Sequence, residues 1–263
     1  GPALSGAASG PCTGGVTAHL VIDEGTIRRQ GPGNIVAVCY RQIRTERALR
    51  RRGICFRTAD ENAVADAYRR MSVAEFDLIN GRQDWANWRT IPRSLSGHVA
   101  DRPLTVLDLG CGTGSSTAVL AFYCPQGSRI IGYEFTAALV DIARQRDYRQ
   151  QSGAAVAVEF VCQSVTEELR QPGGEALPDR SVDVINASGI VGHHLNSTSA
   201  APLVAEMQRL LVADGIAMLD VGPTLDAKEL PRLMAGAGFR CLGRRRSCFI
   251  DPGGQMIFAR ARG

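Results

Sequence analysis

Lysine is nearly absent from this chain of 263 residues: Lys228 is one of 30 basic residues, and the other 29 are arginines. The net charge is nevertheless only +4, which gives little support for binding nucleic acid through overall charge. No apolar run is close to the length of about 18 residues that a membrane-spanning helix needs. The first residues of the sequence lack the charged and apolar regions of a secretory signal. We therefore expect a cytoplasmic protein with no membrane span.

The eight cysteines include no C-x-x-C pair and no Cys/His cluster at the spacing of a zinc site. Several lie in apolar runs, as Cys162 does, where a free thiol packs as a small hydrophobic side chain. We expect reduced cysteines and no bound metal. Apolar residues make up 44% of the chain and charged residues 21%, so wholesale disorder is excluded.

Composition and periodicity divide the chain into three parts. Residues 1–33 begin with Gly, Ala, Ser and Pro and are predicted to form a flexible N-terminal arm. Residues 34–102 carry apolar side chains at helical spacing and are predicted to form a helical extension or cap. Residues 103–263 alternate β-rich and helical runs, which indicates an α/β domain whose parallel sheet has helices on both faces.

The same patterns predict individual elements. Strands are expected over 104–109, 129–133, 156–162, 182–187, 216–221, 239–242 and 256–259, with an N-terminal segment 19–22 that could be a short strand. Helices are expected over 35–52, 60–70, 115–123, 136–150, 200–211 and 225–237, and one more begins at the capping box Ser72-Val-Ala-Glu75. Residues 35–40 taken alone could equally form a strand.

The most informative segment runs from Asp108 through Gly110, Cys111 and Gly112 to Gly114. An apolar strand leads directly into three alternating glycines, and a helix follows at once. Glycines let the backbone turn sharply and approach a ligand closely, and the helix N-terminus offers unpaired N–H groups. The G-x-G-x-x-G pattern of dinucleotide sites is not met, because Ser115 stands at its last position.

This Asp-x-Gly-x-Gly-x-Gly segment resembles motif I of the class I S-adenosylmethionine-dependent methyltransferases. The resemblance implies a Rossmann-like, doubly wound sheet that is mostly parallel with an antiparallel last strand. It also implies S-adenosyl-L-methionine as cofactor, with the loop around its methionine and ribose. Glu134 ends the second strand, 22 residues after Gly112, and the resemblance assigns it the ribose hydroxyls.

Further cofactor residues follow from the same resemblance. Phe135 would lie beside the adenine ring, although a core aromatic is the competing interpretation. At the end of the third strand stand Ser164 and Val165, where family members often have an Asp that contacts the adenine amine. This departure leaves the adenine contact to a hydroxyl or to the backbone. Asn186, at the end of the fourth strand, would lead from the cofactor into the acceptor pocket.

The acceptor side is less determined. His193 and His194 follow the fourth strand in a Gly-His-His-Leu segment similar to that of ubiquinone- and menaquinone-type small-molecule methyltransferases. A histidine there can act as a general base, and capping of the loop is the competing interpretation. Trp85, Trp88 and Arg89 precede the sheet and would contact the substrate, unless they serve ordinary packing and exposure.

Two functions remain open. The first is methyl transfer to a small-molecule acceptor selected by the cap, which we expect. The second is modification of nucleic acid or protein, or docking on them, through an arginine stripe (Arg41, Arg44, Arg47 and Arg51) and the triplet at 244–246, although such a stripe is more often a solvated helix face. The fourth strand is followed by no Asn-Pro-Pro-Tyr-like or Pro-Cys segment, which disfavours methylation of DNA bases. The sequence does not predict an oligomeric state.

Overall fold

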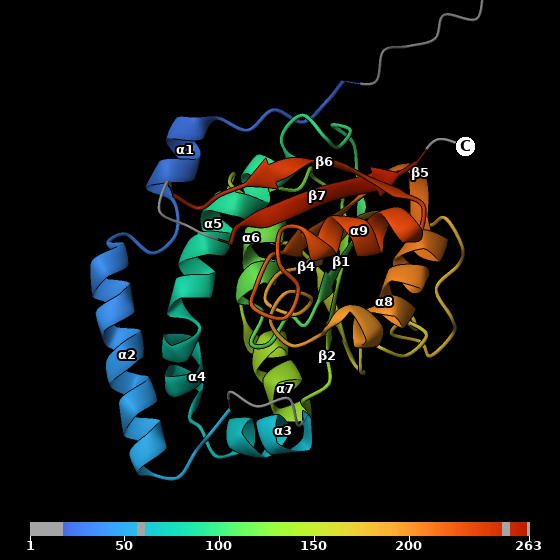
Figure 1. Cartoon of the computed structure of the whole chain (residues 1–263). Helices are drawn as coiled ribbons and strands as arrows, with labels where there is room; N and C mark the ends of the chain where they lie inside the picture. Colours follow the sequence, from blue (N-terminus) through green and yellow to red (C-terminus); the bar gives the residue numbers. More distant parts are fainter. Residues whose placement is uncertain (1–17, 57–60, 249–252, 262–263) are drawn as a thin grey trace, which may run out of the picture.

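The computed structural model describes residues 18–56, 61–248 and 253–261. At its centre lies a seven-stranded sheet in the order β3-β2-β1-β4-β5-β7-β6 (Figure 1). The strands are β1 Thr105–Leu109, β2 Arg129–Glu134, β3 Val158–Cys162, β4 Val182–Ala187, β5 Leu211–Asp220, β6 Phe239–Arg245 and β7 Gln255–Arg260. The pairs from β3 to β5 are parallel, and β7 runs antiparallel to both its neighbours. The predicted fold class is therefore confirmed.

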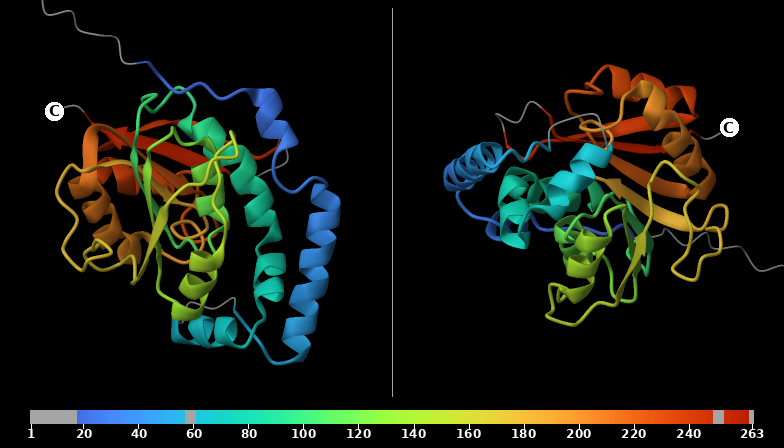
Figure 2. Two further views of the ribbon diagram at one scale, coloured as in Figure 1. Left: turned by 180° about the vertical axis from the view of Figure 1, so that it is seen from behind. Right: turned by 90° about the horizontal axis from the view of Figure 1, so that it is seen from below.

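Helices cover both faces of this sheet, as Figure 2 shows. One core contains α5 (Gly81–Leu95), α6 (Ser115–Tyr123) and α7 (Ala137–Gln145), and the other contains α8 (Ser197–Leu210) and α9 (Glu229–Gly236). Strand residues alternate between the two cores: Val106 packs in the first, and Leu107 packs in the second. Buried strands of this kind read as continuous apolar runs, which is why the sequence predicted them.

The cap consists of α1 (Glu24–Arg29), α2 (Ile35–Arg51), α3 (Glu61–Arg69), α4 (Val73–Ile79) and α5. Asn34 caps α2 by accepting hydrogen bonds from two backbone amides, and the predicted capping box opens α4. Helix α5 lies between α2 and α6 and contacts both (Figure 1). This helix therefore joins the cap to the sheet domain. None of the helices in the described ranges is long and apolar enough to cross a bilayer.

Some predicted bounds need correction. The helix expected over 136–150 ends at Gln145, where the Tyr148 hydroxyl donates to the Ala143 carbonyl and closes the last turn. The segment 19–22 makes one isolated bridge, between His19 and Ala100, instead of a strand.

The predicted arm also differs in part. Residues 1–17 lie outside the described ranges, but residues 24–29 form α1, because the Asp23 carboxylate accepts a hydrogen bond from the Thr26 amide.

Candidate cofactor and acceptor site

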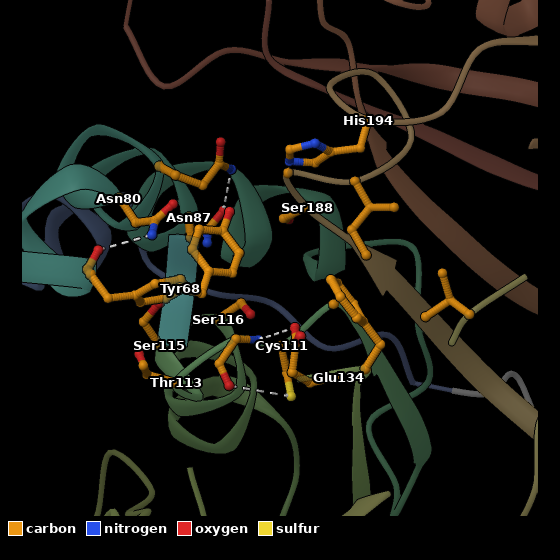
Figure 3. A pocket seen from close by; sticks show the side chains of 18 of the residues that line it. Tyr68, Asn80, Asn87, Cys111, Thr113, Ser115, Ser116, Glu134, Ser188 and His194 are labelled. Carbon is orange, nitrogen blue, oxygen red and sulfur yellow. Dashed lines mark hydrogen bonds between the residues drawn. The ribbon is translucent and has the colours of Figure 1, made fainter. Parts of the chain in front are cut away.

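A cavity of about 560 Å³ opens at the carboxyl ends of β1, β2, β3 and β4. This edge includes the point where the strand order reverses between β1 and β4, which is where doubly wound sheets bind ligands. The loops after these strands form one wall, and cap helices α3, α4 and α5 form the other. Figure 3 shows Ser188 and His194 across the pocket from Asn80 and Asn87, with Glu134 and Cys111 below them in this view.

The glycine loop folds into a shape that side chains would prevent. Gly110 has a φ of +68°, and a Cβ there would lie 1.9 Å from the Ile190 Cδ1 atom of the loop after β4. Gly114 has a φ of +85°, and a Cβ there would lie 2.1 Å from the Tyr148 hydroxyl. Both glycines therefore combine left-handed backbone with close approach of a second segment. Gly110, Cys111 and Gly112 line the cavity, whereas Gly114 lies behind them as the N-cap of α6.

Glu134 holds the loop from the neighbouring strand. Its carboxylate accepts hydrogen bonds from the Gly112 amide at 3.3 Å and the Thr136 amide at 2.9 Å, one on each oxygen. Glu134 is 5% exposed and lines the cavity, and burial raises the pKa of its carboxyl group. Each carboxylate oxygen has a second acceptor position. The residue can therefore accept hydrogen bonds from two hydroxyl groups of a ligand.

Three more predicted cofactor residues line the same cavity: Phe135, Ser164 and Val165. Phe135 is 42% exposed, so it is not the core aromatic that sequence reasoning kept as an alternative. An exposed aromatic ring at a cavity wall offers an apolar face to a flat ring system. The Ser164 hydroxyl lies 2.9 Å from the Thr166 hydroxyl, so backbone groups and hydroxyls, rather than a carboxylate, are available at this wall.

Asp108 and Asn186 do not line the cavity but lie fully buried beneath it. The Asp108 carboxylate accepts hydrogen bonds from Ser116 and Thr117 of α6 and from the Asn186 side chain of β4. Burial raises the pKa of Asp108, and these three hydrogen bonds oppose the rise. These contacts show that Asp108 and Asn186 hold the glycine loop in place. The sequence predicted that both residues contact the cofactor, but neither lines the cavity.

A chain of hydrogen bonds continues from this anchor to the cap. Ser188, which lines the cavity, donates to Asn186, and the Gln255 amide donates to Asn186, Ser188 and Asp220. The Gln83 amide of α5 donates in turn to Asp220 at 2.6 Å and to Asn87 at 2.9 Å. The polar network therefore links β1, β4, β5 and β7 to the helix that faces the cavity.

One face of α5 was missed in the sequence. Besides the predicted Trp88, four polar side chains line the cavity at helical spacing: Asn80, which is the N-cap of α5, and Gln83, Asp84 and Asn87 within the helix. These side chains are polar although the helix is largely buried. The sequence does contain a signal for this cavity-facing side of α5: polar residues recur every three to four positions inside the tryptophan-containing segment.

Asp84 is the acidic member of this face. Burial raises the pKa of its carboxyl group to about 6, with further repulsion from Asp77 and opposition from Arg146. Arg146 pairs with Asp77 at 2.9 Å and donates to the Thr113 hydroxyl at 2.9 Å, which ties α4 to the glycine loop. The cavity therefore contains a carboxyl group that changes protonation close to neutral pH.

The two histidines have different positions. Both backbone amides donate to the Ile190 carbonyl in the turn after β4, but only the His194 side chain lines the cavity. Desolvation, with additional repulsion from His194, lowers the pKa of His193. Of the pair, His194 is thus the one placed to meet a ligand.

The three predicted substrate residues are also separated. Trp88 lines the cavity while its ring packs against Phe122 and Tyr123. Trp85 and Arg89 lie on another side of α5, in a second hollow. The structure therefore does not bring Trp85 and Arg89 to the main cavity with Trp88, because α5 turns residues 85 and 89 away from residues 84 and 88.

Residues 106–215 match the family of methyltransferase domains. Trans-aconitate 2-methyltransferase of Paracidovorax citrulli is 36% identical over 83 residues, which cover 32% of this chain and 26% of that protein. 2-Phytyl-1,4-naphtoquinone methyltransferase of Thermosynechococcus vestitus is 45% identical over 65 residues, which cover 23% of this chain and 29% of that protein. Both matches span less than a third of the relative's own length.

The fold has counterparts among solved structures. A TehB-like SAM-dependent methyltransferase from Corynebacterium glutamicum aligns over 76% of this chain and 100% of its own, with a TM-score of 0.51 and 18% identity. At this identity the likeness concerns the fold.

Proposed function

Because residues 106–215 match the family of methyltransferase domains, we propose that the chain is a class I S-adenosylmethionine-dependent methyltransferase that transfers a methyl group to a small-molecule acceptor. The observation that carries the proposal is the shared cavity. The glycine loop, Glu134 and Phe135 line it on one side, and the polar face of α5 lines it on the other. Donor and acceptor can therefore meet without leaving the protein.

The residues present fit the cofactor. Glu134 is buried, faces the cavity and has acceptor positions for two ribose hydroxyls, and Phe135 offers an exposed ring to adenine. Ser164 and Val165 would border the adenine from the end of β3. The backbone at Gly110 and Gly112 would face the methionine part, and Asp108 and Asn186 would act through the loop that they hold.

S-Adenosylmethionine supplies a methyl group that is already activated on a sulfonium, so the chain mainly has to align an acceptor with the S–CH₃ bond. Such positioning can lower the activation barrier of a reaction of this kind by about 7–11 kcal/mol. The amide side chains of Asn80, Gln83 and Asn87 would orient a polar acceptor through hydrogen bonds. The small molecules named in the two relatives, an aconitate and a naphthoquinone, support an acceptor of similar size.

Two groups on opposite walls could take a proton from the acceptor: the His194 imidazole and the Asp84 carboxylate. We propose His194 as the base when the acceptor is a hydroxyl or an acidic carbon, because it belongs to the loop after β4 and lines the cavity opposite α5. Asp84 would then hold a hydrogen-bond donor of the acceptor.

Two measurements test this proposal. Calorimetry with S-adenosylhomocysteine should show binding, and its absence would remove the cofactor assignment. A screen with methyl-labelled S-adenosylmethionine against metabolite extract of the source organism should label a small molecule. With that acceptor, His194→Ala should lose turnover while keeping cofactor affinity, and the adjacent His193→Ala is the matched control that should stay active. Equal activity of both variants would exclude His194 as the base.

A further inference from the structure

A second hollow of about 450 Å³ lies on the face of α5 that points away from the main cavity. Four arginines line it around Trp85: Arg28 from α1, Arg89 and Arg93 from α5, and Arg246 just after β6. Trp85, Arg89 and Arg93 follow one another at intervals of four residues, so they form one stripe of the helix. The hollow shares none of its lining residues with the methyl-transfer cavity.

The positive charge of this hollow is only partly balanced. Glu24 forms ion pairs with both Arg28 and Arg93. Four arginines against this one carboxylate leave a formal charge of +3. Among the described residues, no carboxylate forms an ion pair with Arg89 or Arg246. The remaining charge is therefore available to an anion.

Arg89 is the buried member, with 8% of its surface exposed. Its guanidinium lies over the Trp85 ring at 3.8 Å and donates to the carbonyl oxygens of Trp85 at 2.8 Å and Pro32 at 3.3 Å. Carbonyl oxygens satisfy donors but carry no full negative charge. Burial, followed by repulsion from Arg93, lowers the pKa of Arg89. A buried cation next to a second cation gains stability when an anion joins them.

We propose that this hollow is a binding site for the phosphate group of a small soluble molecule. A phosphate dianion matches the excess positive charge, and its oxygens accept paired hydrogen bonds from guanidinium groups. Arg246 is exposed and Arg89 is buried, so an anion between them would contact one exposed and one buried guanidinium.

The surroundings favour a small ligand over a nucleic-acid strand. Two members of the basic triplet next to this hollow are already engaged: Arg244 donates to the Gly253 carbonyl, and Arg245 donates to the Arg93 carbonyl. The triplet therefore offers no continuous row of free guanidinium groups for a polyanion. The hollow itself is bounded on two sides, by α1 and by the segment after β6.

Calorimetry of the full chain with inorganic phosphate tests the site, in a buffer free of phosphate and sulfate and with sodium chloride keeping the ionic strength constant. Wild type should show saturable binding. Arg246→Gln should weaken it by about tenfold, because one charge-assisted hydrogen bond is lost at an exposed position that the fold does not need. Arg47→Gln is the matched control: it removes the same charge from an exposed position on α2 and should bind as wild type does.

Arg89→Lys should weaken phosphate binding further, since an ammonium group lacks the planar fork and the stacking on Trp85. Equal affinity of Arg246→Gln and Arg47→Gln, or no saturable binding by wild type, would overturn the proposal. A short single-stranded RNA titrated in parallel separates the two sources of phosphate. RNA that binds more tightly than phosphate and loses affinity in Arg246→Gln would show a nucleic-acid surface and would also overturn it.

Discussion

Glu134 joins the glycine loop, the end of β2 and the cavity through one carboxylate. Glu134→Gln keeps the shape but replaces one acceptor oxygen by a donor. We expect S-adenosylhomocysteine to bind about tenfold more weakly or worse, because a ribose hydroxyl and the Gly112 or Thr136 amide lose an acceptor. Calorimetry measures this change. Glu159→Gln, an exposed carboxylate on the adjacent β3, should leave the affinity unchanged, and an equal loss in both variants would contradict the role of Glu134.

Asp84 should make stability depend on pH. Its folded-state pKa of about 6 lies above the ordinary value of 3.8, so the folded protein binds the proton more tightly than the unfolded chain. The contribution of Asp84 to the free energy of unfolding is then most favourable below pH 4, falls as the pH rises from about 4 to 6, and stays constant above that range. Asp84→Asn should therefore gain about 1–2 kcal/mol over wild type at pH 8 and little at pH 4.

Urea denaturation at the two pH values measures the Asp84 effect. Asp141→Asn removes a carboxylate that is 66% exposed and should show no such difference. The same Asp84→Asn variant should lose methyl transfer if the carboxylate orients the acceptor, so stability and activity would change in opposite directions. A variant that is no more stable at pH 8 than wild type would show that Asp84 is not desolvated as described.

At the scale of elements, α5 borders two different hollows with two faces. Its N-cap Asn80 and its residues Gln83 and Asp84 line the main cavity, and Arg89 and Arg93 line the second hollow. The helix also packs on α6 through Trp88. Periodicity in the sequence detects that a helix has distinct faces, but it does not say which neighbour each face meets. For this reason the segment 85–89 was assigned as a unit to the acceptor, and the structure divides it.

The loops after β1 and β4 depend on each other at Gly110. Gly110→Ala would place a Cβ 1.9 Å from Ile190 Cδ1 on backbone with a φ of +68°. We expect a loss of about 2–3 kcal/mol in stability and weaker S-adenosylhomocysteine binding. Because Ile190 Cδ1 is the end of a flexible side chain, Gly110→Ala combined with Ile190→Ala should recover part of the loss and leave about 1–2 kcal/mol of backbone strain.

Thermal unfolding of the Gly110 single and double variants, with Ile190→Ala alone as the reference, measures the coupling between the two loops. Additive losses would show that the loops do not meet as described.

For the whole molecule, the sequence predicted what local patterns determine. Apolar runs located the strands of the sheet, and the spacing from Gly112 to Glu134 located two groups that the parallel sheet brings to one edge. It did not separate His193 from His194, because neighbours in a turn have no periodicity that distinguishes them. The sequence also predicted that Asp108 contacts the cofactor, because Asp108 lies two residues before the glycine loop. The sequence does not reveal that Ser116 and Thr117 of α6 bind this carboxylate by hydrogen bonds.

Binding of the cofactor between sheet and cap should stabilise the molecule as one unit, because the cavity walls come from α3, α4, α5 and the four strand ends. A ligand at 100 times its Kd adds about 2.7 kcal/mol to the free energy of unfolding. For a chain of this length that corresponds to a rise in Tm of about 5–10 °C. Scanning calorimetry with S-adenosylhomocysteine measures the rise, with NAD as the matched dinucleotide control. A rise in Tm with NAD and none with S-adenosylhomocysteine would reassign the glycine loop to a dinucleotide. A rise with S-adenosylhomocysteine that Glu134→Ala abolishes, and none with NAD, would place the nucleoside at the end of β2.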